Sequence, residues 1–298
     1  MAFRARVLGA AAGGGLPQWN CGCENCGLAR SGAIPSLTQS SLAVSADGET
    51  WAVLNASPDI REQIAANACL HPTGPRKSPI RSVLLTNGDI DHVAGLLSLR
   101  EQQPFTLFAT GEIHGVLSAN PIFDALSAEK VSRQSIEVGT PFDLLEGMEA
   151  TLFPVPGKVP LYMEAAEVQT DLEGEQTVGV ELVCGPERIF YIPGCALVTE
   201  RLADRIRGAD LLFFDGTLWT DDEMQRTGVG TKTGRRMGHI SMSGPEGSIA
   251  AMAEMGIARK IFVHMNNTNP VLRPVSPERA EAEAAGWRIA QDGMEITL

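Results

Sequence analysis

The most restrictive feature of this sequence is an apolar segment that runs directly into a polar loop. Residues 80–86 (IRSVLLT) are typical of a buried strand, and residues 87–92 (NGDIDH) follow without a break. Residues 93–101 then predict a helix. Carboxylates and a histidine in such a loop are suitable metal ligands, as Asp91 and His92 are here. The order strand, polar loop, helix therefore predicts a metal site at a strand end, although an Asp-His pair can also serve only as a helix cap.

Further short strands and helices are predicted on both sides of this loop. Residues 216–243 are rich in glycine and have no clear period, which predicts a long functional loop. The strands are expected in antiparallel pairs with helices in both halves. We therefore expect a single α/β domain over residues 1–298, folded as a four-layer αββα sandwich. The expected strands are 4–8, 41–45, 51–55, 80–86, 104–109, 177–184, 188–192, 210–214 and 260–264, and the expected helices are 57–68, 93–101, 112–118, 199–207 and 247–255, with a last helix and strand in 276–298.

A cluster of cysteines near the start indicates a second metal site. Cys21, Cys23 and Cys26 lie within six residues of one another in the segment 17–30. Three thiols at this spacing suit one tetrahedral Zn²⁺, although another metal that favours soft ligands would also fit. A remote fourth ligand would pin this segment to the rest of the fold. The candidates for that ligand are Cys69, His71, Cys195 and His239.

Charge and hydropathy exclude several classes of function. The formal net charge is −12, which disfavours nucleic-acid binding because phosphates require clustered Lys and Arg. No apolar run approaches the ~18 residues of a membrane span, and the first residues lack the apolar core of a signal peptide. We expect a cytoplasmic protein. Its cysteines would then be reduced, which favours metal binding over disulfides.

Two further strand ends carry residues that could join the first site. Asp215 ends one predicted strand and His264 ends another, so both could converge with Asp91 and His92, or could be an ordinary turn aspartate and core histidine. A basic group, Lys232, Arg235 and Arg236, lies in the long loop. It is either a solvated loop or a clamp for a carboxylate-rich substrate, since Arg pairs well with carboxylates.

Several segments together resemble the family of B proteins of pyrroloquinoline quinone (PQQ) biosynthesis, which have the metallo-β-lactamase fold. The resemblance implies the αββα sandwich, and related phosphodiesterases with a similar cysteine motif imply that His239 completes the zinc site. The segments are residues 6–9 (RVLG), 13–15 (GGG), 17–21 (PQWNC), 55–59 (NASPD), 89–92 (DIDH), 214–217 (FDGT), 237–239 (MGH) and 264–270 (HMNNTNP).

The resemblance also shows which metal ligands are missing. The superfamily pattern His-x-His-x-Asp-His reads here as Asn87-x-Asp89-x-Asp91-His92. The loop 154–158 contains no histidine, and Gly194-Cys195 stands where a bridging aspartate is expected. A dinuclear hydrolase needs both metals, so this mechanism is disfavoured. One site remains, formed by Asp91, His92 and His264 as the catalytic set, with Asp215 as a less certain fourth ligand; whether Asp89 binds metal stays open.

Two histidines and a carboxylate suit non-haem Fe²⁺ with O₂ as cosubstrate, although Zn²⁺ could also bind. The resemblance implies an iron-dependent hydroxylase that acts on the tyrosine ring of the Glu–Tyr-derived PQQ precursor. Two alternatives stay open: a soluble carrier that helps transport PQQ or its precursor towards the periplasm, and a residual mononuclear zinc hydrolase. Other PQQ biosynthesis proteins are expected partners, and a homodimer is compatible with the sequence.

Overall fold

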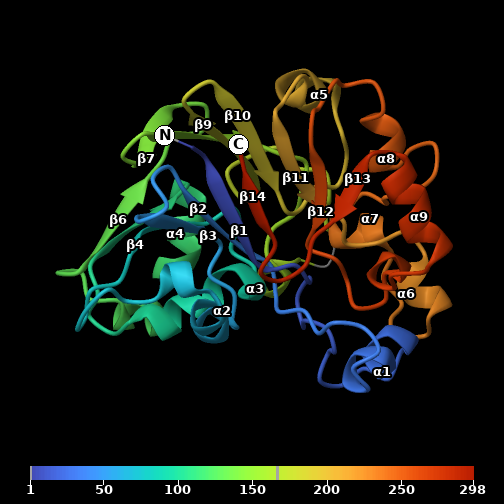
Figure 1. Ribbon diagram of the computed structural model, residues 1–298, viewed down its shortest axis with the longest axis horizontal. Coiled ribbons are helices and arrows are strands. Elements are labelled where there is room, and N and C mark those ends of the chain that lie inside the picture. The colour runs from blue at the N-terminus through green and yellow to red at the C-terminus, as the bar shows by residue number, and fades with distance from the viewer. Residues whose placement is uncertain (1, 166–167) are drawn as a thin grey trace.

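Two seven-stranded sheets pack face to face in the computed structural model, with helices on their outer faces (Figure 1). The structure describes residues 2–165 and 168–298. The predicted four-layer αββα sandwich is confirmed. The first sheet has the order β14-β1-β2-β3-β4-β5-β6 and the second β13-β12-β11-β10-β9-β8-β7. Their strands are β14 (Glu295–Thr297), β1 (Arg4–Gly9), β2 (Ser41–Ser45), β3 (Trp51–Leu54), β4 (Ile80–Leu84), β5 (Phe105–Ala109), β6 (Val131–Ser135), and β13 (Trp287–Ile289), β12 (Lys260–Val263), β11 (Leu211–Asp215), β10 (Glu187–Ile192), β9 (Val178–Cys184), β8 (Met148–Pro154), β7 (Pro141–Leu145).

The expectation of purely antiparallel pairs is wrong for half of each sheet. The strands from β3 to β6 and from β10 to β13 pair in parallel, whereas β1, β2 and β3 and β7 to β10 are antiparallel. Parallel strands are covered on both faces and therefore read as continuous apolar runs, as Leu211–Asp215 does. The carboxyl ends of β4, β11 and β12 consequently point to one common edge of the sandwich.

Most of the predicted helices are shorter in the structure, whereas the predicted helix 112–118 is confirmed as α4. The α-helices are α1 (Glu24–Arg30), α2 (Ile60–Ala66), α3 (Ile90–Val93), α4 (Gly111–Ser118), α5 (Glu200–Ile206), α6 (Glu223–Arg226), α7 (Gly234–Met237), α8 (Ser248–Ala251) and α9 (Pro277–Ala284). Short 3₁₀ turns join them: η1 (Ala68–Leu70), η2 (Ala94–Leu99), η3 (Pro121–Ala125), η4 (Leu161–Met163) and η5 (Pro270–Leu272).

Packing explains the largest of these differences. Most of the expected helix 93–101 is the 3₁₀ turn η2, because Gly95 N donates to the Ala56 carbonyl at 2.9 Å instead of to a carbonyl of the same helix. Only glycine fits there, since a Cβ would come within 2.1 Å of the Ser57 carbonyl oxygen. The expected loop 216–243 contains α6 and α7 and is closed by a bridge between Leu218 and Ser241. Tertiary contacts therefore override the local pattern in both regions.

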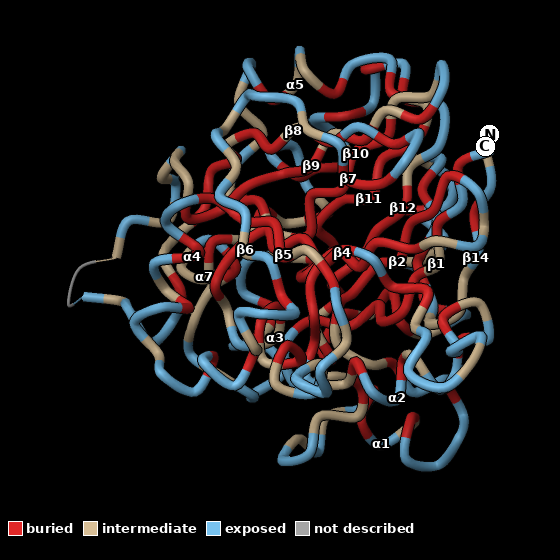
Figure 2. The backbone as a smooth tube through the Cα atoms, turned by 90° about the vertical axis from the view of Figure 1, so that its left-hand side faces the viewer, coloured by how far each residue is buried: buried red, intermediate tan, exposed pale blue. Residues whose placement is uncertain are grey.

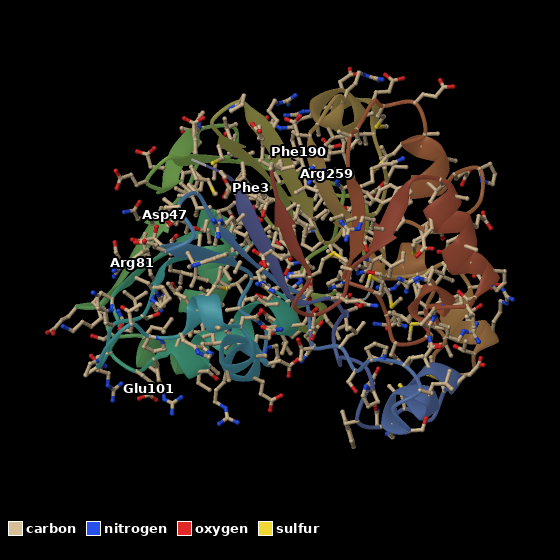
Figure 3. The ribbon with its side chains drawn as sticks, in the orientation of Figure 1. Phe3, Asp47, Arg81, Glu101, Phe190 and Arg259 are labelled. Atoms are coloured by element: carbon tan, nitrogen blue, oxygen red, sulfur yellow. The ribbon has the colours of Figure 1, made fainter. Side chains whose placement is uncertain are left out.

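The core lies between the two sheets, where the chain is buried almost throughout (Figure 2). Phe3 and Phe190 are fully buried, one from each half of the chain (Figure 3). The other labelled residues, Asp47, Arg81, Glu101 and Arg259, are exposed. In the described part of the chain, no helix combines the length and apolar character needed to cross a membrane.

Asp292 ties the last turn of the chain to two segments near its start. Its Oδ1 accepts a hydrogen bond from Ala10 N at 2.9 Å, and its Oδ2 accepts from Thr38 N and Thr38 Oγ1, both at 2.7 Å. Burial raises the pKa of Asp292 to about 6. The folded chain therefore holds the proton of the Asp292 carboxyl group more tightly than the unfolded chain does. The contribution of Asp292 to stability is thus present below about pH 4 and is lost as the pH rises through 6.

We expect the Asp292→Asn variant to gain stability relative to the unmodified chain as the pH rises. Between pH 5 and 7 the gain is about 1 kcal/mol, because the variant has no proton to lose. Urea unfolding at several pH values measures it, with the exposed Asp143→Asn variant as the control. Parallel stability curves for the Asp292→Asn variant and the unmodified chain would contradict the prediction.

Candidate metal centres

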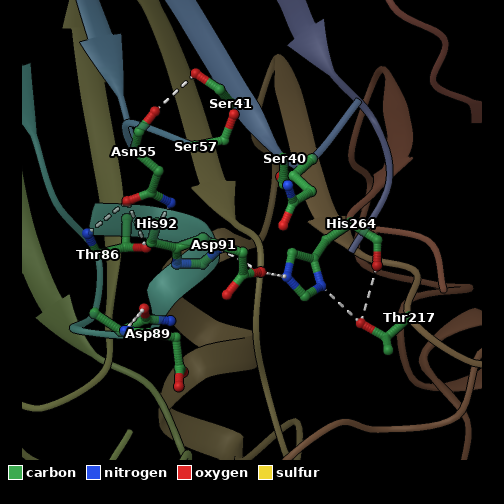
Figure 4. A network of polar contacts seen from close by, with 12 residues as sticks. Ser40, Ser41, Asn55, Ser57, Thr86, Asp89, Asp91, His92, Thr217 and His264 are labelled. Carbon is green, nitrogen blue, oxygen red and sulfur yellow. Dashed lines mark hydrogen bonds and ion pairs between the residues drawn. The ribbon is translucent and has the colours of Figure 1, made fainter. Parts of the chain in front are cut away.

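Two segments that are distant in the sequence bring metal-binding side chains together at the common sheet edge (Figure 4). Asp91 and His92 follow β4, and His264 follows β12. The Asp91 Oδ2 atom lies 3.1 Å from His264 Nε2 and 3.8 Å from His92 Nε2. Ligand atoms of all three residues lie within 4.8 Å of one another. The structure thus brings together the set that the sequence proposed as catalytic.

This geometry fits a metal ion. Two ligand atoms at about 2.1 Å from one ion lie about 3.0–3.4 Å apart when they are neighbours in its coordination shell. His92 is 1% exposed, and neither ring nitrogen has a hydrogen-bond partner among the described residues. Burial lowers the pKa of His92 to about 4, so the ring is neutral at pH 7. A neutral buried imidazole with no partner is the form that binds metal.

The backbone and a threonine fix the orientation of His264. Its φ is 58°, an uncommon value for a residue other than glycine, and it turns the chain sharply at the end of β12. Thr217 Oγ1 lies 2.6 Å from Asp215 Oδ1 and 2.9 Å from His264 Nδ1. Because the hydroxyl donates its single proton to Asp215, it accepts from His264 Nδ1. The His264 Nε2 atom is therefore the one that faces Asp91.

The charge on His264 supports the same interpretation. Burial alone would lower the pKa of His264, but the hydrogen bond to Asp91 raises it. Burial alone would likewise raise the pKa of Asp91, but His92 and His264 hold it below its usual range. The proton between Asp91 and His264 occupies the position that a cation would take, and metal binding at such a site releases the proton.

Asp215 is fully buried and lies behind His264 rather than beside Asp91. Its two oxygens accept hydrogen bonds from Cys195 N, Thr217 N, Thr217 Oγ1 and His239 Nδ1. Burial would raise the pKa of Asp215, but the contact with His239 holds it low. Asp215 does form a possible ligand group with His239 and His264. Its predicted role as a fourth ligand stays a prediction, since its oxygens already have protein donors.

The prediction that His239 completes the cysteine site is wrong. His239 Nδ1 lies 2.7 Å from Asp215 Oδ2, and its ring stacks on His264 with centroids 5.3 Å apart. The bridge between Leu218 and Ser241 brings this segment to the end of β11. His239 therefore lies beside the first metal group, which consists of Asp91, His92 and His264. The other proposed fourth ligands, Cys69, His71 and Cys195, are also absent from the cysteine group within the described residues.

Cys21, Cys23 and Cys26 gather around a different side chain, Asn267. Their sulfur atoms lie within 4.8 Å of one another, and Asn267 Nδ2 lies 3.2, 3.4 and 3.4 Å from the three sulfurs. The two ends of an amide look alike, so a half-turn of this side chain points its oxygen at the sulfurs. Asn267 belongs to the segment HMNNTNP. No pattern in the sequence singles out Asn267, since asparagine is an uncommon ligand of zinc.

Asp89 and Lys158 lie on the other side of the first metal group. Burial and the charge of Asp91 raise the pKa of Asp89, and the charge of Lys158 opposes the rise. Leu161 N donates to Asp89 Oδ1 at 3.2 Å. The glycine loop before the cysteine cluster covers the same region, because a Cβ on Gly13 would lie 3.4 Å from Asp91 Cγ.

The predicted basic group is divided between two places. Arg236 pairs with Glu164 at 2.9 Å and is half-buried, whereas Arg235 pairs with Glu246 at 3.1 Å in solvent. Lys232 lies in the turn before α7. A cavity of about 990 Å³ opens between His239, Arg235 and the segment that contains Ser243 and Glu246. A ligand of moderate size could therefore reach the edge of His239.

Comparison with known proteins places these features in a family context. Residues 50–265 match the model of the beta-lactamase superfamily domain. The chain is 61% identical over 292 residues to coenzyme PQQ synthesis protein B of Ruegeria pomeroyi, which covers 98% of this chain and 99% of that protein. It is 58% identical over 299 residues to the protein of the same name from Rhizobium meliloti, which covers 99% and 98%.

Solved structures give the same result. The crystal structure of Zn(2+)-bound PqqB from Methylobacterium extorquens has a TM-score of 0.98 and 57% identity, and covers 99% of this chain and 100% of that chain. A diphosphatase from the PhnP family has a TM-score of 0.71 at 19% identity, covering 100% and 98%, and therefore shares the fold alone.

Proposed function

The chain belongs to the beta-lactamase superfamily and, within it, to the family of coenzyme PQQ synthesis protein B, and on this basis we propose that it is an oxygen-dependent hydroxylase of PQQ biosynthesis. Its substrate would be the tyrosine ring of the Glu–Tyr-derived precursor. The observation that carries the proposal is the group Asp91, His92 and His264, in which a buried neutral histidine has no partner. Two histidines and a carboxylate with open positions are typical of non-haem Fe²⁺ sites.

When bound, Fe²⁺ would activate O₂, so that one oxygen atom enters the ring and the other leaves as water, with two electrons and two protons supplied by an external reductant. The chain's own residues hold and orient it: Asp91 Oδ2, His92 Nε2 and His264 Nε2 are the ligand atoms. Thr217 and Asp215 keep His264 in the tautomer whose Nε2 is free. Such supporting contacts raise the basicity of a ligand and fix its direction.

His239 is the residue suited to move a proton. Asp215 accepts from its Nδ1, which leaves Nε2 available at the edge of the large cavity. A histidine oriented by a buried carboxylate is a common general base. We assign His239 the uptake of the phenol proton during ring hydroxylation.

The charge of Lys158 favours a site with one metal ion over a site with two. Its ammonium group acts on Asp89, where the superfamily pattern has its first metal. A second cation beside Asp89 would meet this fixed positive charge in a buried setting, where like charges repel strongly. A dinuclear hydrolytic mechanism is therefore the weaker candidate.

The decisive experiment is anaerobic loading of the metal-free chain with Fe²⁺, followed by addition of the Glu–Tyr-derived precursor, a small-molecule reductant and oxygen. We expect oxygen uptake and an increase in precursor mass by whole oxygen atoms. Cleavage of an ester with Zn²⁺ and no oxygen would instead favour the residual hydrolase. Tight PQQ binding with neither reaction would favour the carrier.

For the cysteine cluster we propose a structural Zn²⁺ with Asn267 Oδ1 as the fourth ligand. The convergence of Asn267 on all three sulfurs supports this, as does the metal content of the Methylobacterium extorquens relative, which is described as Zn(2+)-bound. The cytoplasmic location, the homodimer and partnership with other PQQ biosynthesis proteins stay predictions.

A further inference from the structure

A carboxylate of the chain itself sits between two cations beside the first metal group. Glu164 Oε1 lies 3.1 Å from Lys158 Nζ, and Glu164 Oε2 lies 2.9 Å from Arg236 Nη2. The Glu164 side chain is 9% exposed and that of Lys158 is 13% exposed. The hydrogen bond from Arg236 lowers the pKa of Glu164 to about 2, so the group is a carboxylate at neutral pH. Lys158 and Arg236 therefore already form a carboxylate-binding pair.

This pair lies next to the residues assigned to the reaction. The Lys158 stem packs against Gly238, where an added Cβ would lie 3.3 Å from Lys158 Cγ, and Gly238 directly precedes His239. Arg236 is in α7, three residues before His239. The charge of Lys158 also acts on Asp89. A ligand carboxylate held by this pair would thus place the rest of the ligand beside His239 and the metal group.

The segment that carries Glu164 is held mainly by polar contacts. Tyr162 donates to the Gly88 carbonyl at 2.6 Å, and Leu161 N donates to Asp89. The apolar side chains of Leu161, Tyr162 and Met163 remain 56%, 47% and 51% exposed. Because little apolar surface is buried here, moving this segment loses little hydrophobic stabilisation.

We propose that Lys158 and Arg236 form the carboxylate subsite for the substrate, and that Glu164 fills this subsite until a substrate carboxylate replaces it. The proposal rests on the proposed function, because it identifies the bound group as a carboxylate of the PQQ precursor or product. Exchange of one carboxylate for another leaves both cations paired, the largely buried Lys158 and the half-buried Arg236. Leaving Lys158 without a partner would be costly.

Internal competition of this kind lowers the apparent affinity for the ligand in proportion to the fraction of time that the subsite is open. The test is equilibrium binding of PQQ, a carboxylate-rich quinone, to the metal-free full chain. We expect the Glu164→Gln variant to bind PQQ roughly tenfold more tightly and the Arg236→Gln variant roughly tenfold more weakly. The methyl ester of PQQ, which lacks the charges, should bind all variants alike.

Two controls keep the result interpretable. Glu283→Gln removes a carboxylate from an exposed ion pair with Arg279 on α9 and should leave PQQ binding unchanged. The double variant Glu164→Gln/Arg236→Gln removes both members of one pair, so it should fold normally. It should bind PQQ more tightly than Arg236→Gln, because Glu164 no longer occupies the remaining cation, Lys158. Thermal unfolding identifies any variant whose fold is damaged.

Unchanged or weaker PQQ binding by a folded Glu164→Gln variant would overturn the proposal. The proposal would also be overturned if the substitutions changed the affinity for the methyl ester as much as the affinity for PQQ. Binding is measured without metal or oxygen. Failure here therefore leaves the oxygen-uptake experiment untouched, and absence of oxygen uptake would leave the carboxylate subsite standing.

Discussion

Replacing His92 with alanine is expected to remove one metal ion per chain and to reduce oxygen uptake by at least about a hundredfold. Loss of a mere supporting contact to a metal ligand costs 10–100-fold in metal affinity or activity, so loss of a ligand costs more. The other proposed metal, at Cys21, Cys23 and Cys26, should be retained. Metal analysis of the purified variant, together with an oxygen electrode, measures both effects.

The fold should tolerate this change. The His92 ring is buried without hydrogen bonds, so its removal relieves two unpaired polar atoms while it leaves a cavity, and these effects oppose each other. We expect the metal-free variant to unfold within about 1 kcal/mol of the unmodified metal-free chain.

His114 provides a matched control. It is also buried, on α4, but its Nε2 contacts the Gln134 carbonyl at 3.0 Å, and it belongs to none of the possible metal groups formed by the described residues. The His114→Ala variant should keep both metals and full oxygen uptake. Normal metal content in His92→Ala, or an equal loss in His114→Ala, would show that His92 is not a ligand.

The parts of this site that local sequence could predict are those at the ends of strands. Asp91, His92, Asp215 and His264 each follow an apolar run, and parallel strands bring such ends to one edge. The apolar runs alone also located the buried strands. The choice between parallel and antiparallel pairing was not readable, because helices and the facing sheet also cover antiparallel strands: β2 is buried as completely as the parallel strand β11.

The parts that could not be predicted depend on long-range folding of loops. His239, which was expected at the cysteines, lies on Asp215 instead, and Asn267, for which no role was predicted, lies on the cysteines. The segment 216–243 has no helical or strand period that would fix its path, so a histidine within it cannot be placed from spacing. Glu164 gave no signal, since a single glutamate in a loop is usually solvated, and only the fold brings Lys158 and Arg236 to it.

The cysteine site and the first metal group share one loop, which gives the second large prediction. Asn25 Nδ2 donates to the carbonyls of Asn267 and Asn269, both at 2.9 Å, and Asn269 Nδ2 donates to the Gly216 carbonyl at 2.8 Å. His264 begins this same loop. A metal held by the cysteines would therefore fix the segment that orients His264.

We expect the Cys26→Ser variant to lose the cysteine-bound metal and to unfold more easily by on the order of 5 kcal/mol. Structural zinc contributes about 10–16 kcal/mol in peptides that fold only with metal, and here the main core remains. We also expect the first metal group to bind its ion roughly tenfold more weakly, because the support of His264 is loosened. Chemical unfolding and metal titration of the variant measure the two effects separately.

Cys184 is the matched control, since it is a buried cysteine on β9 outside the cluster. Cys184→Ser should keep both metals, and any stability that it loses reflects burial of a hydroxyl alone. If Cys26→Ser lost stability but kept the unmodified affinity at the first metal group, the shared loop would not couple the sites. If the Asn267→Ala variant, in which the three cysteines are intact, lost both stability and affinity at the first metal group, Asn267 would be the residue that couples the two sites. This one side chain contacts the sulfurs and belongs to the loop that begins at His264.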